Sequence, residues 1–236
     1  MFETFCNKKI LVVVAHPDDE LLGCGATLHR LKKELDCAIR VVILGEGLTS
    51  RSATRDTKKW EHDLAIHRAN IEAARKSIGY DSTGIYNFPD NRFDSVALLD
   101  LVKVVEEEKR QFQPDVIFTH HGGDMNVDHQ RTFEAVMTAS RPFGSETVKV
   151  ILTFETPSST EWRPSVDPRH FVPNVVIEVR EPDLEAKING MEAYEFERRK
   201  YPHPRAPEAL RIRAQYWGIT VGCAFAEPFH MVRFIG

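Results

Sequence analysis

Short runs of apolar residues alternate with longer amphipathic segments along the first two thirds of the chain. Residues 9–15 (KILVVVA) form a continuous, mostly β-branched run that ends in a polar cluster. Such a run is typical of a strand that is buried on both faces of a parallel sheet. Leucines then recur at helical spacing as far as Leu35, and residues 40–44 (RVVIL) predict a second strand. The opening segment therefore predicts a βαβ unit.

The same alternation continues downstream. It predicts helices at residues 64–78, 96–111 and 127–140, and strands at residues 84–88, 115–119 and 148–154. Residues 156–173 contain four prolines and three serines, which predicts a long surface loop near the site. Beyond it we expect strands at 174–179 and 231–235 and helices at 183–200 and 207–221. The whole pattern predicts one α/β domain over residues 1–236, with an elaborated carboxyl-terminal half and a doubly wound, mostly parallel sheet that carries helices on both faces.

Composition narrows the class of protein. The chain has 236 residues, and its net charge of -4 comes from interleaved acids and bases, which argues against nucleic-acid binding. The four cysteines form no C-x-x-C pair, so we expect reduced, mostly buried thiols and neither a zinc ribbon nor a redox motif. Neither a membrane-spanning apolar run nor the layout of a signal peptide is visible, which predicts a cytoplasmic protein with no membrane span.

The most unusual polar residues follow the first and fourth predicted strands. His16, Asp18, Asp19 and Glu20 follow the first strand, and a second acidic and histidine-rich cluster spans residues 120–129. Ligands of open α/β sheets bind beyond the carboxyl ends of the strands, where the strand order reverses, and these two strands usually flank that point. We therefore expect His16 and Asp19 to lie near His129.

Two histidines and a carboxylate suit catalytic zinc, which keeps three protein ligands and a water. A neighbouring carboxylate such as Asp18 can accept a proton from that water, whose pKa falls toward ~7 on the metal. Pro17 restricts the backbone after His16 and can open a helix. Acidic residues at the start of a helix can also simply complement the helix dipole. A metal site is favoured here only because the polar clusters after the first and fourth predicted strands are expected to converge. We interpret His29, His62, His67 and His170 as surface or helix-face residues without visible partners.

Two competing motifs fail at specific positions. Residues 23–25 (GCG) begin like a dinucleotide-binding fingerprint, but Leu28 stands at its third glycine position. Residues 124–128 (DMNVD) begin like a calcium-binding loop, but His129 replaces the required glycine and Ala135 its twelfth-position acid.

Residues 15–20 read AHPDDE, and residues 126–129 read NVDH. On these motifs the chain resembles the PIG-L/LmbE-like family of zinc-dependent N-deacetylases, and the resemblance extends to residues 45–47, 89–92 and 226–229. It implies a Rossmann-like fold and removal of an N-acetyl group from an amino sugar or sugar conjugate, with a zinc-bound water as nucleophile. The resemblance further implies one Zn²⁺ per chain, or another divalent metal such as Fe²⁺, on His16, Asp19 and His129. In the same way, Asp18 would be the general base and Asp128 a neighbour that orients a histidine.

Asn126 departs from the family pattern, in which many members carry a histidine at this position. Its amide can donate a hydrogen bond to an oxyanion, but it cannot supply a proton. His121, His120, His203 and His230 remain alternatives for the general acid.

Candidate substrate contacts are arginines, which pair with phosphate or carboxylate, and amide or carboxylate residues that suit sugar hydroxyls. The arginines favour a nucleotide-linked or acidic sugar as the small-molecule partner, although a turn with solvated arginines would give the same pattern. Two alternative functions stay open: hydrolysis of another linear amide, as in a thiol–sugar conjugate, and a non-catalytic nucleotide-sugar-binding module. A homo-oligomer is also possible. The candidate contacts are Arg51, Asp90, Asn91, Arg92, His203 and Arg205.

Overall fold

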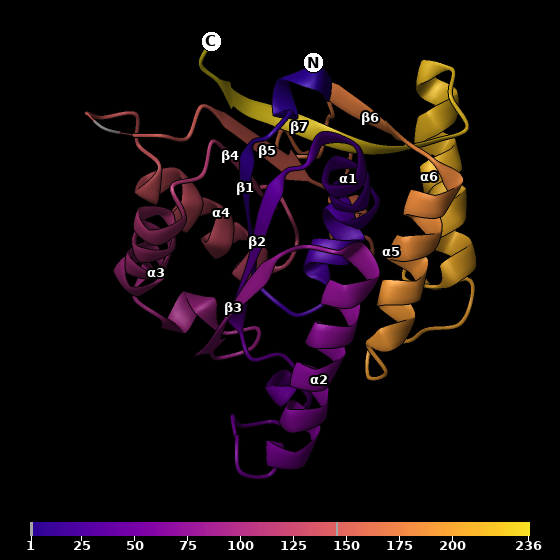
Figure 1. Cartoon of the computed structure of the whole chain (residues 1–236). Helices are drawn as coiled ribbons and strands as arrows, with labels where there is room; N and C mark the ends of the chain where they lie inside the picture. The colour runs from indigo at the N-terminus through magenta and orange to yellow at the C-terminus, as the bar shows by residue number, and fades with distance from the viewer. Residues whose placement is uncertain (1, 145) are drawn as a thin grey trace.

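Strand β1 (Lys9–Val14) lies inside a seven-stranded sheet of order β3-β2-β1-β4-β5-β7-β6 (Figure 1). The computed structural model describes residues 2–144 and 146–236, so the predicted domain 1–236 includes two residues outside the described ones. The first five strands are mutually parallel, and β7 pairs antiparallel with both β5 and β6. The doubly wound, mostly parallel sheet is therefore confirmed. Its other strands are β2 (Ala38–Gly45), β3 (Ser82–Phe88), β4 (Val116–His120), β5 (Val150–Phe154), β6 (Val175–Val179) and β7 (Phe225–Phe234).

Alternate residues of β1 enter two hydrophobic clusters, one on each face of the sheet. Val12 and its even-numbered neighbours belong to the cluster that contains residues of α1 (Asp19–Leu35), α2 (Glu61–Ile78), α5 (Glu181–Ala193) and α6 (Pro207–Val221). Val13 and its odd-numbered neighbours belong to the cluster with α3 (Leu98–Phe112) and α4 (Val127–Ala139). Figure 1 shows these two layers on opposite sides of the sheet. An unbroken apolar run thus reflects burial on both faces, as the sequence indicates.

Two predicted elements of the carboxyl-terminal half differ from the structure. The helix predicted over 183–200 ends at Ala193, because the backbone leaves helical geometry at Tyr194 (φ -77°, ψ 77°). The Tyr194 side chain is buried and donates a hydrogen bond to Glu20 Oε1 at 2.7 Å. Residues 194–206 then leave the helix and form a loop that leads into α6. The closing strand β7 begins at Phe225, earlier than predicted, because it pairs with both β5 and β6.

The glycine at position 23 has a packing role. A Cβ at this point of α1 would lie 2.2 Å from the Phe154 ring, so only glycine allows the helix to approach the sheet this closely. All four cysteines are free, but only Cys24 and Cys37 are buried, fewer than expected. In the described part of the chain no helix combines the length and apolarity that crossing a membrane requires.

Strands β1 and β4 are neighbours, and the chain leaves them in opposite directions across the sheet. The strand order therefore reverses between them, which places the segments after Val14 and His120 at one edge of the sheet.

Candidate active site

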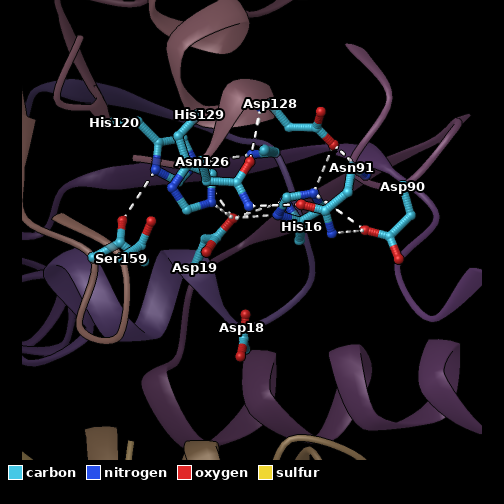
Figure 2. Close-up of polar contacts among 12 residues, drawn as sticks. His16, Asp18, Asp19, Asp90, Asn91, His120, Asn126, Asp128, His129 and Ser159 are labelled. Carbon is cyan, nitrogen blue, oxygen red and sulfur yellow. Dashed lines mark hydrogen bonds and ion pairs between the residues drawn. The ribbon is translucent and has the colours of Figure 1, made fainter. Parts of the chain in front are cut away.

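His16, Asp19 and His129 converge at this reversal of strand order. His16 follows β1, while Asp19 and His129 lie in the first turns of α1 and α4. One donor atom from each residue lies within 4.8 Å of the others. The Asp19 Oδ2 atom is 3.3 Å from both His16 Nδ1 and His129 Nε2 (Figure 2). These are the three residues that the resemblance implies as metal ligands.

Asp128 fixes the ring of His16 from the opposite side. Its Oδ2 atom lies 2.9 Å from His16 Nε2, and its carboxylate also accepts the backbone N–H groups of Asn91 and Phe93 at 2.6 and 2.8 Å. Asp90 Oδ1 adds a longer contact, 3.4 Å from the same nitrogen. A carboxylate that binds the outer nitrogen of a histidine holds its inner nitrogen toward a metal.

Asp124 faces the outer nitrogen of His129 as an ion-pair partner, a role that the sequence did not indicate. Asp124 Oδ1 lies 3.2 Å from His129 Nδ1. The carboxylate is fully buried and accepts hydrogen bonds from the hydroxyl groups of Ser159 and Thr160. Its sequence position, within the cluster after the fourth strand, is the only signal that could have suggested it.

His120 packs against the ring of His129. The two rings stack with centroids 3.9 Å apart and planes at 8°. His120 Nε2 accepts the Ala15 N–H at 3.0 Å, and Nδ1 faces the Thr156 hydroxyl at 3.1 Å. Burial, together with the nearby His129, lowers the pKa of His120 to about 4, so this imidazole is neutral.

The donor set fits a metal on two grounds. Both ring nitrogens of His129 are buried and make no hydrogen bond within the described residues, an arrangement that a ligated metal and an orienting carboxylate would satisfy. Two imidazoles and one carboxylate are also the ligand set of many catalytic zinc sites. In the metal-free protein burial lowers the pKa of His129, but the carboxylates of Asp19 and Asp124 outweigh it and raise the pKa to about 9.

Asp18 adopts an unusual backbone conformation just before α1, with φ 100°. Glu20 supports this conformation, because its Oε2 accepts the Asp18 N–H at 3.1 Å. The Asp18 carboxylate binds Arg205 Nη1 at 2.8 Å. Burial raises the pKa of Asp18 well above its usual range, an effect that Arg205 opposes. A non-glycine residue in such a conformation is typical of functional sites.

A polar cavity of about 240 Å³ contains both the histidine cluster and Asp18. Four of the six predicted substrate contacts line it, namely Arg51, Asp90, Asn91 and Arg205, and so does Asn126. Its further lining includes Gly47, Ser50, His67, Thr156, Ser158, Ser159, Glu197 and Arg199.

The other two predicted substrate contacts, Arg92 and His203, are not among the described residues that line this cavity. Arg92 donates from Nη2 to the Ala53 carbonyl at 3.1 Å, and His203 Nδ1 accepts the Arg205 N–H at 3.2 Å. The four histidines considered as general acid are also absent from its described lining. His120 is buried behind His129, whereas His121 Nε2 and His230 Nδ1 face the carbonyls of Arg169 and Val172.

His67 corrects another expectation, because it is neither exposed nor peripheral. It is 2% exposed, lines the cavity and packs edge-on against Tyr194, with ring centroids 5.7 Å apart. Burial lowers the pKa of His67 to about 4. The buried positions Ile71, Ala74 and Ile78 of α2 extend back to residue 67 at helical spacing, a signal visible in the sequence. His29 likewise has a partner, since its Nδ1 lies 2.6 Å from Asp183 Oδ1.

Comparisons with known proteins give a family and a fold. The family model described as PIG-L, GlcNAc-PI de-N-acetylase, matches residues 11–140. An uncharacterized deacetylase of Escherichia coli (strain K12), YaiS, is 31% identical over 193 residues, which cover 80% of this chain and 91% of that protein.

Solved structures share the fold at low identity. N,N'-diacetylchitobiose deacetylase from Pyrococcus horikoshii superposes with a TM-score of 0.70 at 21% identity, covering 96% of this chain and 84% of that one. GalB of Pseudomonas putida KT2440, a 4-carboxy-2-hydroxymuconate hydratase, gives a TM-score of 0.73 at 19% identity, covering 97% and 98%. Because the same fold serves a deacetylase and a hydratase, the fold does not decide the reaction.

Proposed function

This chain belongs to the PIG-L family of GlcNAc-PI de-N-acetylases, and we propose that it is a zinc-dependent hydrolase that removes the N-acetyl group of an amino sugar or sugar conjugate. The observation that carries the proposal is the convergence of His16, Asp19 and His129 beside Asp18 in one polar cavity. A single carboxylate would not be sufficient evidence for this reaction, and neither would the fold alone.

His16 Nδ1, Asp19 and His129 Nε2 would hold the metal, with Asp128 and Asp124 on the outer nitrogens of the two histidines. Zinc bound there supplies Lewis acidity toward the amide carbonyl and lowers the pKa of water toward ~7. The same ligands accept other divalent metals, Fe²⁺ among them.

Asp18 would take the proton from the attacking water. It lines the cavity next to the ligand Asp19, and its buried carboxylate has a raised pKa, which makes it a better base than an exposed aspartate. The same carboxylate, once protonated, would give the proton to the departing amine. We assign this second role to Asp18 because the described lining of the cavity does not include His120, His121, His203 or His230. His67 does line the cavity, but burial lowers its pKa to about 4, so it carries no proton to give at neutral pH.

Asn126 would stabilise the oxyanion that develops at the acetamide carbonyl. Its Oδ1 is engaged, since it accepts the Asp128 N–H at 2.8 Å at the start of α4. Its Nδ2 donates to Asn91 Oδ1 at 2.9 Å, which leaves the second N–H of the amide for the substrate. A donor fixed in place before the reaction stabilises developing charge effectively.

The experiment that tests the proposal measures acetate release from a panel of free, phosphorylated and nucleotide-linked N-acetyl sugars and an N-acetylated thiol–sugar conjugate. We expect release from at least one member that a chelator stops and that added zinc restores. His129→Ala should lose both zinc and activity, and a full zinc content in this variant would refute its role as ligand. If no member gives chelator-sensitive release, the proposal fails and a nucleotide-sugar-binding module is favoured.

A cytoplasmic location also stays a prediction from the sequence.

A further inference from the structure

Three arginines from two separate segments meet on the wall of the same cavity. Arg51 ends the short turn after β2, whereas Arg199 and Arg205 belong to the loop 194–206 between α5 and α6. All three bind the single carboxylate of Glu197: Arg205 Nη1 at 2.8 Å, Arg199 Nη2 at 3.2 Å, and Arg51 Nη2. The cavity wall is therefore built around a shared ion-pair cluster.

The charges of this cluster do not balance. Glu197 is shared by all three guanidinium groups, and among the described residues one further carboxylate forms an ion pair with them, that of Asp18, which binds Arg205 at 2.8 Å. Arginine remains charged at any ordinary pH. One positive charge is thus left over within this cluster even when both carboxylates are ionised. The two other carboxylates of the described cavity lining, Asp19 and Asp90, contact His16 instead.

The three arginines differ in how many hydrogen-bond donors they have left for a ligand. Arg205 is fixed on two further sides, since its Nε donates to Ser158 Oγ at 2.7 Å and its Nη1 to Asp18. Arg51 makes its hydrogen bonds to described residues from Nη2 alone, to Glu197 and to the Phe196 carbonyl. About a third of the Arg51 and Arg199 side chains is exposed, at 36% and 35%. Arg199 uses Nη2 for Glu197 and Nη1 for the carbonyls of Phe196 and Arg198, which leaves its Nε without a partner among the described residues. Arg51 keeps both Nε and Nη1 without such a partner.

We propose that Arg51 and Arg199 form a binding subsite for an oxyanion, a phosphate or carboxylate group, on the N-acetylated substrate. The subsite deepens the proposed function and rests on it for the identity of the substrate. A guanidinium group binds either oxyanion through paired hydrogen bonds in a fixed plane. Glu197 holds the two guanidinium groups together, and Arg205 stays with Asp18. The substrate class is then an anionic amino sugar, such as a sugar phosphate, a nucleotide-linked sugar or a uronate.

A purely structural role for the cluster is the competing explanation. Contacts between Arg51 and residues 196 and 197 also fasten the loop 194–206 to the turn after β2. Under that explanation the wild-type protein has no affinity for small oxyanions, and this difference can be measured without turnover.

The test uses the full chain after treatment with a chelator, so that metal cannot bind the probe. Inorganic phosphate and glucuronate are titrated calorimetrically in the millimolar range into the wild type, Arg51→Gln, Arg199→Gln and Arg110→Gln. Arg110 is the matched control, because it lies on α3 outside the cavity lining and pairs with Glu107. Circular dichroism establishes that each variant is folded.

We expect the wild type and Arg110→Gln to bind at least one probe equally well. Arg51→Gln and Arg199→Gln should bind it roughly tenfold more weakly, the loss typical of one charge-assisted contact. Preference for phosphate over glucuronate identifies a phosphorylated or nucleotide-linked sugar, and the reverse identifies a uronate. Absence of binding to the wild type, or equal binding by all four proteins, overturns the proposal.

A second arm separates this proposal from the proposed function. Where acetate release is detectable, the ratio of kcat/KM for N-acetylglucosamine 1-phosphate to that for N-acetylglucosamine should fall roughly tenfold in Arg199→Gln and stay constant in Arg110→Gln. For a uronate-selective protein the N-acetylated uronate replaces the phosphate. Lack of turnover on every substrate refutes the deacetylase assignment but leaves the binding result standing, whereas an unchanged ratio refutes the subsite alone.

Discussion

His16 directs its Nε2 atom at Asp128 Oδ2, 2.9 Å away, and thereby presents Nδ1 to the side where Asp19 and His129 lie (Figure 2). The contact joins the segment after β1 to the first turn of α4. Asp128 is itself held by two backbone N–H groups, so the imidazole is oriented before any metal binds.

Replacing Asp128 by asparagine should therefore weaken zinc binding. The side chain keeps its shape but loses the charge that orients His16, and changes of this kind typically reduce metal affinity by roughly 10–100-fold. Competition with a chromophoric chelator measures the affinity. Asp100→Asn is the control, because Asp100 is an exposed carboxylate in the first turn of α3. Equal zinc affinity in the two variants would show that Asp128 does not act on the metal site.

Zinc binding should release protons near neutral pH. In the metal-free protein burial lowers the pKa of His16, but Asp128 and Asp19 raise it well above its usual range, and the pKa of His129 is raised to about 9. With a pKa of about 9, His129 is protonated at neutral pH and must lose a proton to ligate zinc, and the pKa of His16 is shifted in the same direction. The apparent zinc affinity should therefore rise with pH below about 9. Calorimetric titration in two buffers with different ionisation enthalpies checks this, and identical heats in both would contradict it.

His67 should make folding stability depend on pH. Its folded pKa of about 4 lies below the unfolded value of 6.5, so the unfolded chain binds the proton more tightly. The stabilisation is present above pH 6.5 and is lost as pH falls toward 4, by about 2 kcal/mol between neutral pH and pH 5.

Urea unfolding at these two pH values tests the prediction with a matched pair of variants. His67→Gln should show a loss of stability on acidification that is about 2 kcal/mol smaller than that of the wild type. His62→Gln, on the exposed face of the same helix, should behave as the wild type does. An unchanged pH dependence in His67→Gln would mean that His67 is not held neutral by burial.

The parts of the molecule that local pattern controls could be predicted from the sequence. The apolar run of β1 and the helical spacing after it fix a strand and a helix, and parallel strands place their carboxyl ends at one edge. These elements are sufficient to predict that His16 and Asp19 lie close to His129, because the strand order reverses between β1 and β4.

What the sequence did not reveal depends on tertiary contacts between distant segments. Asp124 is held by Ser159 and Thr160 only because the segment after β5 returns to the site. Glu197 lies in a stretch with helical propensity, and it reaches Arg51 because α5 ends where Tyr194 turns inward to Glu20. No periodicity encodes such contacts, so the positions of Arg92 and His203 outside the described lining could not be foreseen.

The central claim is that Asp18 moves the proton while its neighbours hold the metal. Asp18→Asn keeps the size of the side chain but removes the base, so a general-base role predicts a loss of acetate release by roughly 10²–10⁴-fold. Zinc content, measured on the same purified sample, should equal that of the wild type because Asp18 is not a ligand. The most direct test is therefore acetate release per bound zinc in Asp18→Asn. A near-wild-type rate per zinc would contradict the account, and so would loss of the metal.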